Sequence, residues 1–279
     1  MIIRGINGKE TALEIAGALG DNVFKSLPEE PVSPRMRKWV LRNGIPTYLI
    51  RWGCATKMPY VVPELNSRGA IILASDKGRA REVMLDKKVD IPAIVTNFND
   101  ESLYPIIIRP RHHRAGMGFY FFNNPKEFRA SGFKFGTDAH YAASFFNKSR
   151  EFRAYIAHGA LLAVDEKIPR EEGNRKEKIW NHANGMFIFQ NVRQGSVPRS
   201  IRRSAKEAID AIGLDFGAVD IMHDNGAAKV LEINTAPTFT GEYLIGKFAT
   251  YFRWAIDNIK DGCFPPHIND AIWWKEEGE

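Results

Sequence analysis

The sequence is poor in cysteine, has no long apolar run and carries no large excess of charge of one sign. Its 279 residues include 2 cysteines, Cys54 and Cys263, far apart and without the spacing of metal ligands. A disulfide framework or a zinc knuckle is therefore not expected, and the thiols should be reduced and inert. No apolar run approaches the ~20 residues that span a bilayer. The start of the chain also lacks the features of a signal peptide, so we expect a cytoplasmic protein with no membrane segment.

Charge is close to balanced. The 39 Lys and Arg residues against 33 Asp and Glu residues give a formal net charge of +6. This mild excess would suit a polyanionic partner such as nucleotide phosphates, an acidic peptide or nucleic acid, and it selects none of them. A composition of 44% hydrophobic and 26% charged residues is typical of a globular protein. The length allows one large unit or two to three packed lobes.

Periodicity predicts a small α/β lobe in the first part of the chain. The segment ALEIAGAL has helical spacing, and a basic helix is separated by Gly44 and Pro46 from a short strand at Thr47 to Arg51. The next segment, AIILAS, reads as an apolar strand. Ser75 or Asp76 is then expected to cap a helix.

A basic loop with glycines lies between two β-like runs from Tyr104 to Phe122. The loop, PRHHRAGMG, could bring backbone N–H groups close to a phosphate at Gly116 and Gly118, with arginines balancing the charge. It has the spacing of neither a Walker loop nor a dinucleotide fingerprint, so a solvated basic hairpin is the alternative. The adjacent histidines, His112 and His113, are interpreted as loop polar groups rather than metal ligands.

Two further hairpins follow. The first, EFRAYIAHGALLAVDEKI, turns at His158 and Gly159 and projects Glu151, Arg153 and Tyr155 from one face, where a structural ion pair is the simplest interpretation. A helix is predicted at about 202 to 213, and the C-terminal part of the chain contains another.

The second hairpin, FGAVDIMHDNGAAKVLEIN, carries alternating polar groups. Ala218, Asp220 and Met222 share one face of its first strand, and Val230, Glu232 and Asn234 share one face of its second. A loop of odd length would pair Asp220 with an even-numbered position and bring the three polar groups together. A two-residue loop would instead pair Asp220 with Leu231. Two carboxylates and an amide oxygen suit magnesium, whereas a solvent-facing strand pair is the alternative.

Four segments occur in an order similar to that of ATP-grasp ligases. They are SDKGRAREVMLDKKVDIPAIV, YPIIIRPRHHRAGMGFYFF, EFRAYIAHGALLAVDEKI and GLDFGAVDIMHDNGAAKVLEINTAPTFTG. The resemblance covers roughly residues 70 to 245 and is closest to ribosomal-protein glutamate ligases and short phage-encoded relatives. It implies an α+β protein of the ATP-grasp fold, in which two α+β lobes with antiparallel sheets enclose ATP behind a small α/β domain. The implied domains are residues 1–70, a first lobe at 71–148 and a second lobe at 149–279.

The resemblance also implies roles for individual residues. Asp220, Glu232 and Asn234 match the family's magnesium ligands. The residues that match nucleotide-binding positions are Lys77 and Arg109 for the phosphates, Gly116 and Gly118 for the loop above them, Phe145 and Phe146 for the adenine, and Glu151 for the ribose. Arg153, Lys167 and Asn181 match positions around the transferred phosphoryl group. The chain departs from the family at Arg109, where many members have lysine, and at Thr238, where glycine often follows the proline.

The implied function is an ATP-dependent ligase that joins a carboxylate to an amine or thiol through an acyl-phosphate. Its cofactors would be ATP and magnesium, with manganese as the alternative metal. The carboxylate could belong to an amino acid, a peptide or a protein, and the acceptor and the oligomeric state are left open. Two other functions remain: a phosphotransferase on the same fold, and a non-catalytic nucleotide- or nucleic-acid-binding protein. The three metal-type ligands argue against the second of these.

Overall fold

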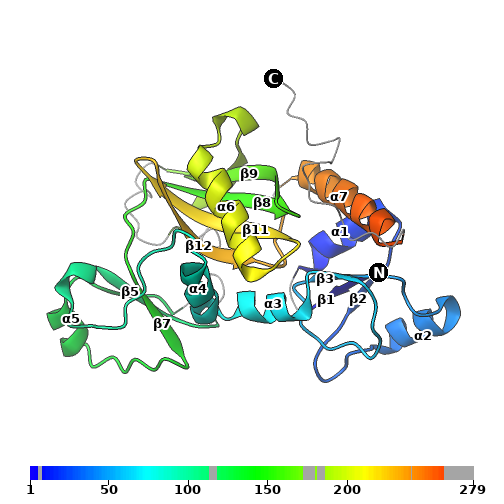
Figure 1. The fold of residues 1–279 in the computed structure, drawn as a ribbon, viewed down its shortest axis with the longest axis horizontal. Helices are drawn as coiled ribbons and strands as arrows, with labels where there is room; N and C mark the ends of the chain where they lie inside the picture. The colour runs from blue at the N-terminus through cyan, green and yellow to red at the C-terminus, as the bar shows by residue number, and fades with distance from the viewer. Residues whose placement is uncertain (6–7, 113–117, 172–179, 181–185, 240, 261–279) are drawn as a thin grey trace.

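The computed structural model describes residues 1–5, 8–112, 118–171, 180, 186–239 and 241–260. Three sheets, each with its own helices, make up this part of the chain (Figure 1). Among the described residues, no helix combines the length and the apolar character needed to cross a bilayer.

The N-terminal sheet is parallel, with strand order β2-β1-β3-β4. Its strands are β1 (Ile2–Arg4), β2 (Val23–Lys25), β3 (Leu49–Trp52) and β4 (Glu64–Leu65), and its helices are α1 (Lys9–Leu19) and α2 (Pro34–Asn43). The predicted α/β character of this region is confirmed. Trp52 at the end of β3 stacks on Phe216 of the central sheet, with ring centroids 5.5 Å apart, and this contact joins the two parts of the core.

Two short helices, α3 (Arg68–Ser75) and α4 (Lys77–Asp86), follow this sheet. The prediction of an apolar strand at AIILAS is wrong, because this run forms most of α3. The Ser67 side chain caps the helix by accepting a hydrogen bond of 3.1 Å from the backbone N–H of Ala70. The buried Ala74 lies four positions after Ala70 and three after Ile71, the spacing of residues on one helix face. Asp76 caps α4 as expected, accepting from the N–H of Arg79 at 3.0 Å.

The second sheet is antiparallel, with strand order β6-β5-β7. Its strands are β5 (Ile106–Pro110), β6 (Tyr120–Phe122) and β7 (His140–Ser144), and α5 (Pro125–Ala130) packs beside them. The two β-like runs predicted around the basic loop are therefore confirmed. One face of this sheet packs on a cluster of aromatic rings, in which Phe98 and Phe128 are stacked 4.5 Å apart.

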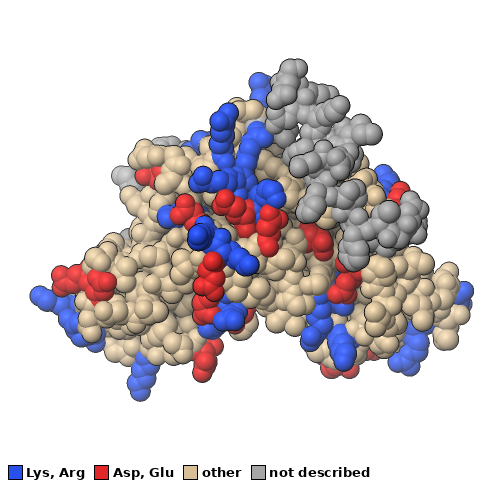
Figure 2. All heavy atoms as spheres, viewed as in Figure 1, with Lys and Arg blue, Asp and Glu red and all other residues tan. Residues whose placement is uncertain are grey.

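The central sheet is antiparallel and five-stranded, with order β10-β9-β8-β11-β12. Its strands are β8 (Arg150–Ala157), β9 (Ala160–Pro169), β10 (Phe187–Asn191), β11 (Phe216–Asp224) and β12 (Ala227–Asn234). One face is covered by α6 (Arg199–Ile212), whose buried Ala205, Ala208 and Ile209 pack on it. The outer surface of α6 carries charges of both signs, including the Lys206–Asp210 ion pair (Figure 2).

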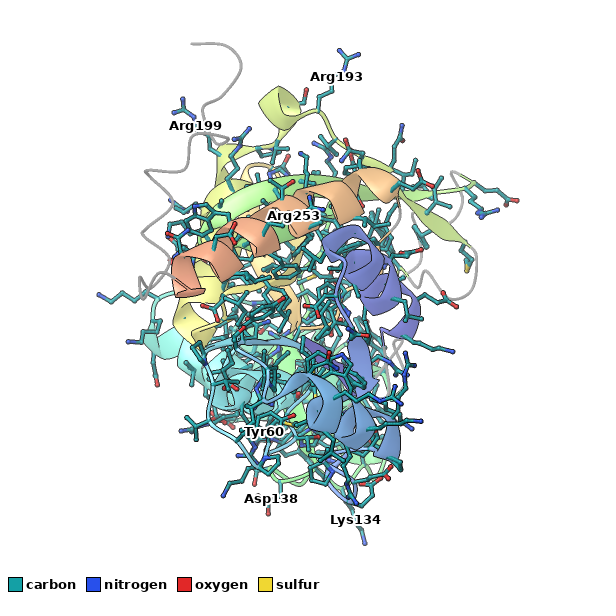
Figure 3. All side chains as sticks on the ribbon, turned by 90° about the vertical axis from the view of Figure 1, so that its right-hand side faces the viewer. Tyr60, Lys134, Asp138, Arg193, Arg199 and Arg253 are labelled. Carbon is teal, nitrogen blue, oxygen red and sulfur yellow. The ribbon has the colours of Figure 1, made fainter. Side chains whose placement is uncertain are left out.

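The last helix, α7 (Glu242–Lys260), packs on α1 and on the face of the central sheet opposite α6. Arg253 of α7 donates a hydrogen bond to the carbonyl oxygen of Ala18 at the end of α1 (Figure 3). The buried face of α7 includes Leu244, Phe248 and Phe252. This helix therefore ties the N-terminal sheet to the central sheet, and the rest of the face that it covers carries polar residues.

Candidate active site

The β11–β12 hairpin brings the predicted metal ligands into register. Asp220 lies directly opposite Glu232, and Ala218 lies opposite Asn234. The predicted convergence of the polar positions is therefore confirmed at the level of strand pairing.

This register depends on a β-bulge, because the turn of the hairpin alone would give another pairing. Its turn has only two residues, Asn225 and Gly226, both with positive φ, and the strands next to it pair Asp224 with Ala227. Continued regularly, this pairing would place Asp220 opposite Leu231. A β-bulge between Asp220 and Ile221 leaves Leu231 as the extra residue and shifts the pairing by one.

The bulge also corrects the predicted faces of β12. Val230 was expected to share a face with Glu232, and this is wrong, because Val230 pairs with Ile221 and packs in the core beneath α6. Glu232 instead shares the face of its partner Asp220. The bulge thus moves the apolar half of β12 into the core and turns the acidic half towards the polar face.

A row of polar residues crosses that face, one from each strand of the central sheet. The strand pairing aligns, in order, Asn191, Asp165, Arg153, Asp220 and Glu232. Residues directly opposite one another in antiparallel strands lie on the same face, so these side chains are neighbours. A second row beside it pairs Lys167 with Glu151.

Arg153 and Asp220 form the centre of the first row. The guanidinium donates from Nε to Asp220 Oδ1 at 2.7 Å and from Nη2 to Oδ2 at 2.8 Å. Such a bidentate pair is geometrically specific as well as charge-assisted. Burial raises the pKa of Asp220, and the nearby carboxylate of Glu232 adds to the rise, while the Arg153 contact opposes it.

Glu151 lies between two lysines. Its Oε1 accepts from Lys167 Nζ at 2.9 Å, and its Oε2 is 2.8 Å from Lys148 Nζ. Burial acts to raise the pKa of Glu151, but the two ammonium groups outweigh it and hold the pKa below its ordinary value. The site therefore contains a buried carboxylate that stays charged and two lysines held in place by it.

Helix α4 reaches the polar face from the side. Lys77 Nζ donates to the carbonyl oxygen of Ile233 at 3.2 Å and lies 3.6 Å from Glu232 Oε2. One turn further along α4, Arg81 donates to the carbonyl oxygen of Leu231 at 2.7 Å. Lys77 and Arg81 are thus a pair of cations at i, i+4 spacing that hold the bulged part of β12.

The three-stranded sheet supplies the residues on the other side of α4. Arg109 is buried on β5 opposite Tyr141, and the ring of Tyr141 lies under the Arg81 guanidinium, 4.9 Å from its Cζ. Arg111 is held against α4 by a 2.7 Å hydrogen bond from Nε to Asp76. Gly118 has φ of +66° and lies so close to the Pro110 ring that a Cβ would be 2.7 Å from it.

The remaining predicted residues lie outside the strands of the polar face or outside the described residues. Phe145 and Phe146 are half-buried in the connection from β7 to β8, and the Phe145 ring meets Phe121 edge-on at 5.2 Å. Gly116 and Asn181 lie outside the described residues, as does His113.

Sequence reasoning missed several residues of this site. Asp165 is fully buried and accepts hydrogen bonds from Tyr155, Tyr243 and Asn191. It lies two positions before Lys167 on β9, so strand alternation could have placed it on the same face. Arg81 could have been found from its i, i+4 spacing to Lys77. Lys148 has no comparable signal, because it reaches Glu151 from an irregular segment.

The donor set of the polar face fits a hard divalent cation. Asp220, Glu232 and Asn234 offer carboxylate and amide oxygens, which are the ligand types magnesium prefers. Arg153 occupies one acceptor position on each Asp220 oxygen, and an ionised carboxylate has about four such positions. No cluster of three or more His, Cys, Asp and Glu side chains suited to a metal occurs in the described ranges, consistent with a set whose third member is an asparagine.

The chain was compared with protein families, with curated proteins and with solved structures. No protein-family profile matches the chain. The tetrahydromethanopterin:alpha-L-glutamate ligase of Methanocaldococcus jannaschii is 26% identical over 95 residues, which is 34% of this chain and 30% of the ligase. The match thus spans less than a third of that curated relative.

Solved structures match over most of the chain. A D-alanine–D-alanine ligase from Bacillus anthracis has a TM-score of 0.62 at 12% identity, covering 94% of this chain and 98% of the ligase. The ATP-grasp ligase PsnB, complexed with a precursor variant, Mg and ADP, has a TM-score of 0.60 at 12% identity, covering 90% and 97%. An ATP-grasp RimK domain protein from Sphaerobacter thermophilus has a TM-score of 0.58 at 14% identity, covering 90% and 99%. The chain has the ATP-grasp fold.

Proposed function

We propose that this protein is an ATP- and magnesium-dependent ligase that joins a carboxylate to an amine or thiol. The observation that carries the proposal is the pairing of Asp220 with Glu232 on a polar face that also holds Arg153 and Lys167. The ATP-grasp fold supports it, since the similar structures include ligases complexed with ATP and with Mg and ADP.

In this proposal the nucleotide lies between the three-stranded sheet and the polar face. Asp220, Glu232 and Asn234 would hold magnesium, which supplies positive charge to the phosphates. Lys77, Arg109, Gly116 and Gly118 would contact the phosphates, Phe145 and Phe146 the adenine, and Glu151 the ribose. Manganese is the alternative metal. The corresponding domains are residues 1–70, 71–148 and 149–279.

The reaction would proceed in two displacements. A carboxylate oxygen of the substrate attacks the γ-phosphorus of ATP, and ADP leaves. The acceptor amine then attacks the acyl carbon, phosphate leaves with that oxygen, and the amine loses a proton. Arg153, Lys167 and Asn181 would balance the charge on the transferred phosphoryl group, because fixed cations stabilise charge that develops in the transition state. The substrate carboxylate would belong to an amino acid, a peptide or a protein.

The test is ADP release from ATP and magnesium across a panel of amino-acid pairs. We expect one carboxylate and one amine to be required together, and Glu232→Gln to lower turnover by at least about a hundredfold, because even loss of an outer-shell partner of a metal costs about 10- to 100-fold. Glu166→Gln is the matched control, since Glu166 pairs with Arg150 at 2.7 Å on the opposite face of the sheet. ADP release with a carboxylate alone and accumulation of a phosphorylated product would instead indicate a phosphotransferase. Normal turnover in Glu232→Gln would contradict the assigned metal site.

A further inference from the structure

Arg111 joins the end of β5 to the start of α4. Its Nε donates to Asp76 Oδ1 at 2.7 Å, and its Nη1 donates to the carbonyl oxygen of Thr137 at 3.0 Å. The carbonyl oxygen of Arg111 accepts from the backbone N–H of Lys77 at 3.0 Å. The side chain and the backbone of one residue thus both hold the first turn of α4. We call the contacts of Arg111 with Asp76 and Lys77 the Arg111 clamp.

The clamp connects two parts of the candidate active site. α4 lies between the three-stranded sheet and the central sheet (Figure 1). Lys77 reaches β12, where its Nζ donates to the carbonyl oxygen of Ile233 at 3.2 Å. Arg109 lies on β5, two residues before Arg111. The clamp therefore fixes the separation of Lys77 and Arg109, the two cations that the proposed function assigns to the phosphates.

Asp76 serves the helix and the clamp at the same time. Its Oδ1 accepts both from Arg111 and from the N–H of Arg79, which it caps at 3.0 Å. Burial acts to raise the pKa of Asp76, but these hydrogen bonds outweigh it and hold the pKa below its ordinary value. The carboxylate is therefore charged at neutral pH, and its hydrogen bond with the guanidinium is charge-assisted.

Gly78 leaves the space in which the guanidinium lies. An added Cβ there would be 2.9 Å from Arg111 Cζ and 3.0 Å from its Nε, which is closer than ordinary van der Waals contact. Gly78 belongs to the first turn of α4, where alanine would be the better helix former. The sequence therefore has a poor helix former at a position where any side chain would displace Arg111.

We propose that Arg111 is a positioning residue for ATP, which holds Lys77 at a fixed distance from Arg109 and does not itself contact the phosphates. The loop arginines were expected to balance phosphate charge, but two nitrogens of the Arg111 guanidinium are already bound to protein acceptors, and the side chain is only 17% exposed. The inference rests on the proposed function, because it requires ATP to bind at Lys77 and Arg109.

Two substitutions separate positioning from charge. Asp76→Ser keeps a helix cap and removes a carboxylate near the phosphates, so electrostatics alone would strengthen the binding of ATP, whereas loss of the clamp should weaken it. Gly78→Ala displaces the guanidinium without changing any charge. Calorimetric titration with a non-hydrolysable ATP analogue and magnesium measures both. We expect each variant to raise the dissociation constant about tenfold, the lower end of the effect when a metal ligand loses the residue that orients it.

The chain offers a matched control for each substitution. Asp86→Ser makes the same change at the exposed end of α4, and Gly17→Ala makes it in open space on α1. Neither should weaken ATP binding. The melting temperature of Gly78→Ala should not fall, since alanine favours the helix. A lower affinity in this variant is then not the result of unfolding.

A double variant tests the route of the effect. Gly78→Ala combined with Arg111→Gln should bind ATP as Arg111→Gln alone does, because the alanine acts only through the guanidinium. A further loss in the double variant would contradict the clamp. So would Asp76→Ser binding ATP as tightly as the wild-type protein or more tightly, which would indicate an effect of charge alone.

These outcomes are distinguishable from failure of the proposed function. If the wild-type protein binds ATP and the clamp variants bind it equally well, the clamp is wrong and the ligase stands. If ATP binding depends on the clamp but no pair of amino acids is ligated, the clamp stands and the ligase is wrong. No ATP binding by the wild-type protein at millimolar concentration would contradict both.

Discussion

Arg81 in α4 donates a 2.7 Å hydrogen bond to the carbonyl oxygen of Leu231, the extra residue of the bulge in β12. The two residues are 150 positions apart in the sequence, and their hydrogen bond joins α4 to β12 at the bulge that sets Glu232 opposite Asp220. A helix far away in the sequence thus contacts the candidate metal site where its register shifts.

We expect Arg81→Met to lower the free energy of unfolding by about 1 to 3 kcal/mol, the usual cost of leaving a buried acceptor without its donor. It should also weaken magnesium-dependent ATP binding, because the register at Glu232 loosens. Urea unfolding and nucleotide titration measure the two effects. Arg79→Met on the exposed side of the same helix, which loses only an ion pair with Glu82, is the control. ATP binding that is unaffected in Arg81→Met would show that the bulge does not depend on this contact.

The Arg153–Asp220 pair should behave as a coupled unit. Asp220→Asn leaves a buried guanidinium without its charged partner, and breaking a buried pair in this way costs about 3 to 5 kcal/mol. The double variant Arg153→Gln with Asp220→Asn should cost less than the sum of the two single changes, with a coupling of about 0.5 to 3 kcal/mol. Chemical denaturation of the four proteins gives this cycle. Strict additivity would mean that the two groups do not interact in solution.

His223 should make the stability of the protein depend on pH. Burial, with the Arg150 guanidinium adding to it, lowers the pKa of His223 below its ordinary value of 6.5. Between the two values the unfolded chain binds more protons than the folded one, so the free energy of unfolding rises with pH across this window and levels off above about 6.5. In His223→Leu this part of the slope should disappear. An unchanged pH profile in that variant would assign the dependence to other groups.

Gly118→Ala, at the end of the basic loop, should lower the stability of the folded protein. The residue has φ of +66°, and an added Cβ would lie 2.7 Å from Pro110. Gly132 has the same φ in open space, so Gly132→Ala measures the backbone strain alone. We expect Gly118→Ala to lower the melting temperature more than Gly132→Ala does, by the equivalent of about 1 kcal/mol or more. Equal effects would show that the Pro110 contact relaxes freely.

The sequence by itself determined the secondary elements that carry the candidate site. Alternation placed Glu151 and Arg153 on one face of their strand, and Ala218, Asp220 and Met222 on one face of theirs, because the side-chain period of a strand is a purely local property. That Asp220 lies beside Arg153 came only from the pairing of β11 with β8. The Asp76 cap and the apolar stripe of α6 could likewise be predicted from the sequence, since capping and helical spacing involve residues close in sequence.

Only the tertiary structure decided the register of the β11–β12 hairpin and the helical conformation of α3. The local turn at Asn225 and Gly226 favours a pairing of Asp220 with Leu231. The structure instead has a bulge that pairs Asp220 with Glu232, and the carbonyl oxygen of Leu231 there accepts a hydrogen bond from Arg81, 150 residues away. AIILAS forms α3 because three of its apolar residues pack against the central core from one helix face, whereas a strand would need a neighbouring strand with free hydrogen-bonding groups. Both outcomes depend on contacts between segments distant in sequence, which form only in the folded chain.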